Sequence, residues 1–143
     1  MVIMGLVASL VVVNFAQDER SELSDEAERL RLLMEYARDE AILQGQTLAW
    51  SLDKSGYQFA RLDGQDKWVA ISDEPFRRRK LAPPLYARLV SVNAAAATPD
   101  SAILFFPSGL NQAYELELVL KSSRVTLTGD ALGRVRIIPP AKT

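Results

Sequence analysis

The sequence predicts an α+β fold in which one long N-terminal α-helix packs on antiparallel β-sheets. The stretch from Met1 to Val13 is wholly apolar or small, and a helical pattern without a stop signal continues from there to about Gln44. From Thr47 onwards the hydrophobic period falls to two, which is typical of strands. One helix followed by two runs of strands indicates an α+β domain, and 143 residues leave room for a single compact head.

The first 15 residues are predicted to be the hydrophobic part of the helix, in a membrane or a filament core, and residues 16–143 to be the head. The stretch is about seven residues shorter than the roughly 20 that cross a hydrocarbon core, so we expect further apolar residues before Met1. The side chains expected in that core are Val2, Ile3, Met4, Leu6, Val7, Leu10, Val11, Val12, Val13 and Phe15.

Two other interpretations of this stretch fit the sequence less well. A cleaved secretory signal would need a basic start and an Ala-x-Ala site, and neither occurs before Asp18. A buried core helix is disfavoured because the stretch is apolar all round, which a domain of this size could hardly surround.

After Phe15 the helix becomes amphipathic. Leu33, Tyr36 and Ile42 are predicted to widen an apolar stripe that packs on a sheet, while the charged residues form a solvated face. Gly45 is a natural residue to end the helix. The stripe itself recurs at steps of four and three and consists of Leu23, Ala27, Leu30, Met34, Ala37 and Ala41.

Turn clusters divide the rest of the chain into short strands. Two segments between them, Asp73 to Leu85 and Asn93 to Ser101, are predicted to be mobile loops. The predicted strands are Thr47–Leu52, Tyr57–Leu62, Lys67–Ile71, Tyr86–Val92, Ala102–Phe106, Ala113–Leu120, Arg124–Thr128 and Arg134–Ile138.

Aromatic residues mark the expected core of the head. Trp50, Tyr57, Phe59 and Trp68 alternate along the first strands and are predicted to lie under the helix stripe. Neighbouring residues of a strand point to opposite faces, so one ring of the Phe105-Phe106 pair is expected to be exposed and available to a partner.

The composition argues against catalysis and against cofactors. Cysteine and histidine are absent, which removes thiol chemistry, disulfides and the commonest general base. No nucleophile elbow, phosphate-binding loop or dinucleotide fingerprint occurs. We therefore predict a protein that is not an enzyme and has no catalytic, cofactor or metal site.

A basic run provides the candidate partner contacts. It could touch a phosphate backbone, anionic lipid or an acidic partner, although a solvated loop is the plainer interpretation. The 17 basic and 18 acidic residues leave a net charge of −1, which does not favour nucleic acid. With the aromatic residues, the candidate contacts are Phe76, Arg77, Arg78, Arg79, Lys80, Phe105 and Phe106.

Acidic residues near two turns raise the question of a calcium site. Asp63, Asp66, Asp73 and Glu74 could supply oxygen ligands, but their spacing does not fit an EF-hand. Ordinary turn chemistry is the favoured explanation.

Several segments resemble a known family. The apolar start, beginning Val2-Ile3-Met4-Gly5-Leu6, resembles the helix of type IV pilins and pseudopilins, and the segment from Ala37 to Gly45 resembles the helix end of the pseudopilin H family of type II secretion. Tyr57-Gln58-Phe59, Trp68, the Phe105 to Gly109 segment and Gly133 resemble strand landmarks of that family.

The resemblance implies a pilin-like fold and a minor pseudopilin at or near the tip of the periplasmic pseudopilus. Its expected partners are the other minor pseudopilins, the major pseudopilin and, before assembly, the inner membrane, with no small-molecule substrate. A minor type IV pilin that binds DNA through the basic run is the alternative. The family's leader, cleavage site and early glutamate do not occur in the sequence as it stands, so we expect Met1 to be a late start.

Overall fold

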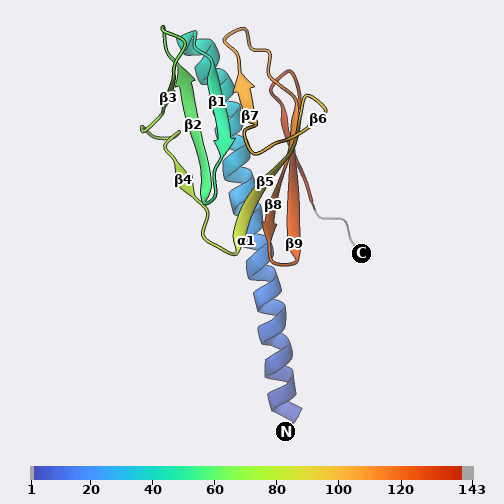
Figure 1. Ribbon diagram of the computed structural model, residues 1–143. Helices are drawn as coiled ribbons and strands as arrows, with labels where there is room; N and C mark the ends of the chain where they lie inside the picture. The colour runs from blue at the N-terminus through green and yellow to red at the C-terminus, as the bar shows by residue number, and fades with distance from the viewer. Residues whose placement is uncertain (1, 140–143) are drawn as a thin grey trace.

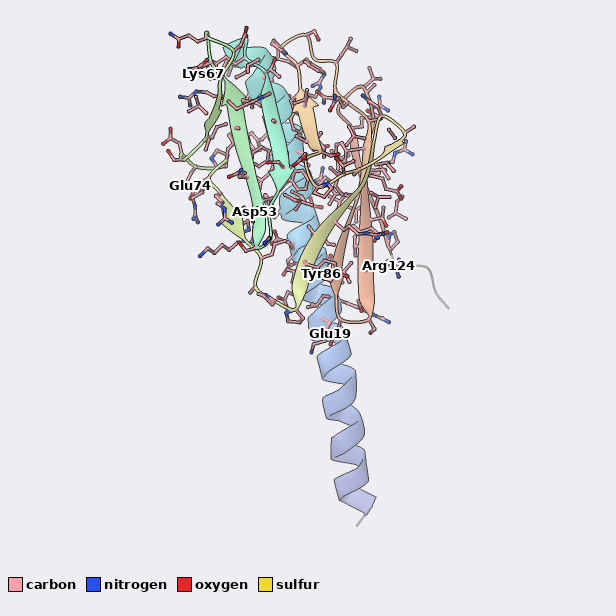
Figure 2. All side chains as sticks on the ribbon, viewed as in Figure 1. Glu19, Asp53, Lys67, Glu74, Tyr86 and Arg124 are labelled. Carbon is pink, nitrogen blue, oxygen red and sulfur yellow. The ribbon has the colours of Figure 1, made fainter. Side chains whose placement is uncertain are left out.

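The computed structural model describes residues 2–139, with side chains from Glu19 onwards. Its dominant element is the helix α1, Val2–Gln44, whose N-terminal part projects beyond the head while its C-terminal part lies along two β-sheets (Figure 1). Glu19 marks the lower edge of the head in Figure 2. Its carboxylate lies 3.3 Å from the ammonium group of Lys121, which is in the turn after Leu120. The predicted α+β architecture is confirmed.

The helix ends where the sequence predicts. Gly45 follows it with a φ of 64°, a left-handed conformation that costs glycine little. The Gln46 N–H then donates to the Ala41 carbonyl at 3.1 Å, which satisfies a carbonyl at the end of the helix.

The first sheet has the strand order β3-β2-β1-β7, with β4 paired to a further stretch of β2. All its pairs are antiparallel, and the first two strands form a hairpin in which Trp50 lies opposite Phe59. The strands are β1 (Leu48–Leu52), β2 (Gly56–Leu62), β3 (Trp68–Ala70), β4 (Arg79–Lys80) and β7 (Ala102–Phe105).

The second sheet is also antiparallel and has the order β10-β9-β8-β5-β6. The chain enters it at β5, returns to the first sheet at β7 and then completes the second sheet. The strands are β5 (Leu85–Val92), β6 (Ala95–Ala96), β8 (Tyr114–Leu120), β9 (Ser123–Gly129) and β10 (Val135–Ile138).

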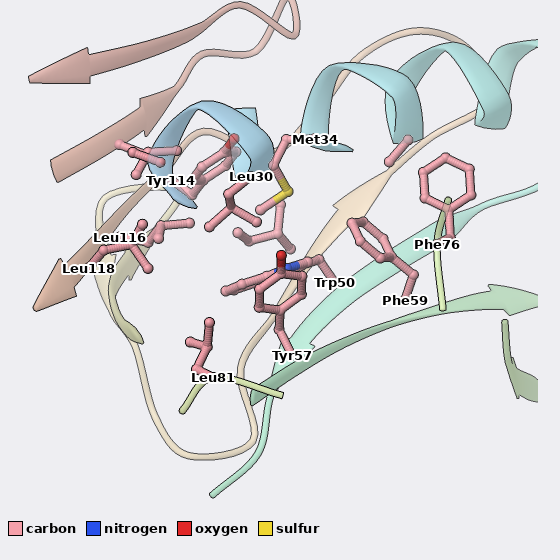
Figure 3. Packing of buried hydrophobic residues seen from close by; sticks show 14 of the residues in the cluster. Leu30, Met34, Trp50, Tyr57, Phe59, Phe76, Leu81, Tyr114, Leu116 and Leu118 are labelled. Atoms are coloured by element: carbon pink, nitrogen blue, oxygen red, sulfur yellow. The ribbon is translucent and has the colours of Figure 1, made fainter. Parts of the chain in front are cut away.

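One core joins the helix to both sheets. Figure 3 shows Leu30 and Met34 of the helix between Trp50 and Phe59 of the first sheet and Leu116 of the second. At about 25 cal/mol per Å² of apolar surface removed from water, burial of such side chains is the main source of the head's stability.

Two short strands were not predicted. Both lie in segments expected to be mobile loops: β4 within Asp73 to Leu85, and β6 within Asn93 to Ser101. The β5–β6 hairpin depends on positive φ values at Asn93 and Ala94, and a positive φ at alanine has no sequence signal.

The prediction that Trp68 belongs to the core is wrong. Trp50, Tyr57 and Phe59 are fully buried, but Trp68 is 49% exposed. Trp68 lies opposite Leu62, whose parity in β2 differs from that of Tyr57 and Phe59, so its side chain is on the face of the sheet away from the helix.

Candidate interaction surfaces

The helix has a core face and an outer face. All six stripe residues, from Leu23 to Ala41, are at most 1% exposed and lie in the core cluster. The opposite face carries Leu32, Tyr36 and Leu43, which recur at steps of four and seven and are all exposed.

Two of the three residues expected to widen the buried stripe are in fact exposed. Tyr36 is 59% and Ile42 43% exposed, while Leu33 is partly buried against the core. Tyr36 follows Met34 by two residues, which is about 200° around the helix axis, so it cannot share the face of Met34.

A buried carboxylate connects the helix to the first sheet. Glu26 is only 6% exposed, and its Oε1 accepts a hydrogen bond of 3.1 Å from the Tyr57 hydroxyl. Its Oε2 accepts one of 2.8 Å from Arg29, and the Arg79 Nε lies 3.4 Å from Oε1 as an ion pair without hydrogen-bond alignment. Burial raises the pKa of Tyr57 far above its ordinary value of 10.0, so the hydroxyl remains a donor.

The basic run is paired within the chain itself. Arg77 forms an ion pair with Glu74, and Arg79 with Glu26. The Arg78 Nη2 lies 2.6 Å from an Asp53 carboxylate oxygen and also donates to the Ser55 hydroxyl at 2.8 Å.

Asp53 is further held by main-chain donors. The N–H groups of Ser55 and Gly56 donate to its Oδ1 at 2.8 and 2.9 Å. The Ser55 hydrogen bond and the Arg78 guanidinium hold the pKa of Asp53 below its ordinary value of 3.8.

The glycine at the start of β2 allows β4 to lie close. A Cβ built on Gly56 would lie 2.0 Å from the Arg79 carbonyl oxygen, so only glycine lets these two strands pair here. This pairing places Arg79 next to Glu26. Lys80 is the residue of the basic run that has no ion pair among the described side chains.

Two of the candidate partner contacts are core residues instead. Phe76 is 6% exposed because its ring packs on Phe59 at a centroid distance of 5.1 Å, and Phe105 is 1% exposed. Neither ring is accessible to a partner. Phe106 is half-buried and is the ring of that pair that reaches the surface.

Large apolar side chains are exposed at the end of the head farthest from Val2. Ile42 and Leu43, at the helix end, are 43% and 79% exposed. Leu110 and Leu132, in two loops, are 60% and 63% exposed. The loops are joined by a 2.9 Å hydrogen bond from the Asn111 N–H to the Ala131 carbonyl. We call these four residues the distal apolar group.

Two glycines bring these loops against the helix end. A Cβ built on Gly109 would lie 3.4 Å from the Ile42 side chain. One built on Gly133 would lie 2.0 Å from the Arg38 side chain, which the β9–β10 turn therefore covers. Sequence analysis missed the distal apolar group; the signal available was a leucine in each of two turns, where polar residues are the rule.

A groove separates the two sheets on the side of β5. It has two adjoining parts of about 360 and 610 Å³, which share Leu52, Asp53, Lys54 and Ala87 in their walls. One wall is the β1–β2 turn and the other is β5, and Figure 2 labels Asp53 and Tyr86 on these two walls.

Of the four acidic residues considered for calcium, Asp63 stabilises a turn and Glu74 pairs with Arg77. The Asp63 Oδ1 accepts hydrogen bonds from the Gln65 and Lys67 N–H groups at 2.8 and 2.9 Å. Among the residues described, no cluster of three or more acidic, histidine or cysteine side chains could hold a metal ion.

The side chains of the predicted membrane or filament-core segment, from Val2 to Phe15, lie outside the described side chains. The backbone there belongs to α1. Within the part of the chain that the structure describes, no helix combines the length and the apolarity that a membrane crossing needs.

Comparison with solved structures shows the fold. The minor pseudopilin EpsH of the Vibrio cholerae type II secretion system matches in two structures, with TM-scores of 0.67 and 0.69 and 19% sequence identity. The matches cover 85% and 86% of this chain and 99% and 97% of EpsH. The type IV minor pilin FimU of Pseudomonas aeruginosa matches with a TM-score of 0.60 and 20% identity, over 85% of this chain and 91% of FimU.

No curated protein matches the sequence. The sequence model of a family described as type II transport protein GspH matches residues 26–135, which is most of the chain and includes the last part of α1 and almost all the strands. The chain therefore belongs to the GspH family of type II transport proteins and has their pilin-like fold.

Proposed function

We propose that this chain is a minor pseudopilin at or near the tip of the type II secretion pseudopilus, where it helps to export folded proteins across the outer membrane. The observation that carries the proposal is the family match over residues 26–135. The fold supports it, because a helix that projects beyond its head can join a filament core while the head remains at the surface (Figure 1).

The apolar segment Val2–Phe15 provides the means of assembly. Before assembly it stands in the inner membrane, and the head lies in the periplasm. In the filament the segment packs with those of neighbouring subunits, at about 25 cal/mol per Å² of apolar surface removed from water.

The partners are the other minor pseudopilins and the major pseudopilin, and the head determines which of them bind. The exposed apolar residues of the head, in the distal apolar group and on the outer helix face, support this, because large exposed apolar side chains gathered in one place are typical of protein contacts.

The DNA-binding alternative loses its main support. It depended on a free basic run, and Arg77, Arg78 and Arg79 each pair with a carboxylate of this chain. Because nonspecific DNA binding is mainly an electrostatic effect, three arginines already in ion pairs and a net charge of −1 leave little to drive it.

The test is binding of the full chain, in detergent, to two targets under the same near-physiological salt. We expect saturable binding to at least one minor pseudopilin head and none to double-stranded DNA. A salt-sensitive DNA complex that Lys80→Gln weakens, with no pseudopilin bound, would contradict the proposal.

A cellular experiment tests the export role. Deletion of the gene in its own bacterium should leave secreted proteins folded in the periplasm, and the intact gene should restore their release. The Leu30→Asp variant, which places a charge in the core of the head, should not restore it. Normal release without the gene would argue against this role.

A further inference from the structure

Strand β5 has one paired side and one nearly free side. Along its length it pairs with β8, from Leu85 opposite Leu120 to Val92 opposite Tyr114. On the other side, β6 pairs only with Ser91 and Val92. The stretch Leu85–Leu89 is therefore a sheet edge, and Figure 1 shows β5 on the side of its sheet that faces the β1–β2 hairpin.

The register shows which main-chain groups of this edge point outwards. Leu120 and Ser123 close the two-residue β8–β9 hairpin, so the main-chain groups of Leu120, and of every second residue before it, point to β9. The alternate residues Val119 and Glu117 therefore bond to their β5 partners, Tyr86 and Arg88.

The main-chain groups of Leu85, Ala87 and Leu89 point away from β8. The N–H of Leu85 confirms this, because it donates to the Ala82 carbonyl outside the sheet at 3.0 Å. The main-chain groups of Ala87 and Leu89 point the same way, towards the groove between the sheets, and both residues line it. No described strand pairs with them there.

The edge is bounded at both ends, which limits its length. Pro83 and Pro84 precede it and have no N–H to donate. The register shifts between Leu89 and Ser91, and the Val90 carbonyl already accepts from the Ala97 N–H at 3.0 Å. An added strand would thus be short, matched to Leu85–Leu89.

Among the described side chains, one basic group of the groove has no ion pair. Asp53 is paired with Arg78, and Arg88 lies 3.1 Å from Glu117. Lys54, in the opposite wall, has no ion pair among the described side chains. The groove therefore favours a segment with an acidic residue near Lys54.

We propose that this edge receives a short, extended, acidic segment from a neighbouring pseudopilin head, which adds as a strand beside Ala87 and Leu89. The inference rests on the proposed function and names the mode of contact. The free main-chain N–H and C=O groups of β5 recur at every second residue beside the groove. An added strand would satisfy both kinds of group at once, so an extended peptide is the ligand that suits this edge.

Hydrogen exchange measured by NMR tests the proposal residue by residue, with the full chain in detergent micelles. In the free protein, the amides of Ala87 and Leu89 should exchange quickly while those of Tyr86 and Arg88 are protected by β8. On addition of the pseudopilin head that binds, exchange at Ala87 and Leu89 should slow.

Two substitutions at one position separate the main chain from the side chain. Ala87→Pro removes an N–H that points to the groove, so the head should remain folded while the Kd for the partner rises about tenfold, as expected for a lost main-chain bond and a blocked edge. Ala87→Ser keeps the N–H and should bind like the original. Arg88→Pro removes a bond to β8 and should lower the melting temperature.

The outcomes distinguish the inference from the function it rests on. Binding of a pseudopilin head that leaves exchange at Ala87 and Leu89 unchanged, and that Ala87→Pro does not weaken, overturns strand addition and keeps the proposed function. Failure of every pseudopilin head to bind overturns both. Lys54→Glu should weaken binding of the partner head at low salt and have no effect at high salt, and this result would support an acidic segment.

Discussion

The Tyr57 hydroxyl donates a 3.1 Å hydrogen bond to the Glu26 carboxylate, across 31 positions of the chain and inside the core. Arg29 and Arg79 compensate the same carboxylate from the helix and from β4. A buried charge is tolerated only where such partners meet it. Glu26 thus connects the helix, β2 and β4.

Tyr57→Phe should destabilise the head by about 1–3 kcal/mol, because it leaves a buried carboxylate without one of its donors. The measurement is the free energy of unfolding from denaturant titration. Tyr86→Phe is the matched control, since the Tyr86 side chain is 53% exposed and should tolerate the change within about 0.5 kcal/mol. Equal stability of the two variants would mean that the Glu26 contact contributes nothing.

The architecture and most of the core could be predicted because they depend on local periodicity. The helix end followed from Gly45, and the buried face followed from steps of three and four between Leu23 and Ala41. Burial of Trp50, Tyr57 and Phe59 followed from alternation. Each of these signals depends only on residues that are close together in the sequence.

What could not be predicted depends on pairing between distant segments. Trp68 obeys the same alternation as its neighbours, but the register of β3 on β2 turns it to solvent. The run from Arg77 to Lys80 looked free because Glu26 and Asp53 reach it only through the fold, and Glu74, three residues before Arg77, is the one local partner. No local pattern tells a paired arginine from a free one.

Leucine-to-aspartate substitutions two positions apart should separate the faces of α1. Leu30→Asp buries an unpaired charge at a fully buried site, and we expect a loss of at least about 4 kcal/mol, enough to unfold a head of ordinary stability. Leu32→Asp changes a side chain that is 45% exposed and should cost less than about 1 kcal/mol. Thermal unfolding followed by circular dichroism measures both. Similar melting temperatures of the two variants would show that Leu30 is not part of the core.

Gly56→Ala should displace β4, because the new Cβ would lie 2.0 Å from the Arg79 carbonyl oxygen, where backbone must move. We expect a loss of about 1–3 kcal/mol in the free energy of unfolding, together with faster amide exchange in β4. Gly64→Ala is the control, since no heavy atom lies within 4 Å of its Cβ. A Gly56→Ala variant as stable as Gly64→Ala would show that β4 can move without cost.

The pH dependence of stability should report on Asp53. Its pKa is lowered in the folded head, first by the Ser55 N–H and then by Arg78, so the folded state binds its proton less readily than the unfolded chain does. The stabilisation is therefore fully present above the ordinary pKa of 3.8 and is lost as pH falls from there through the folded pKa.

Asp53→Asn removes this titration and keeps an oxygen that can accept from Ser55 and Gly56. We expect the variant to be less stable than the original at pH 7, because Arg78 loses its charged partner, and the difference to shrink as pH falls below 3.8. Denaturant titrations at a series of pH values measure it. A difference that stays constant from neutral to acid pH would show that the charge of Asp53 contributes nothing to the fold.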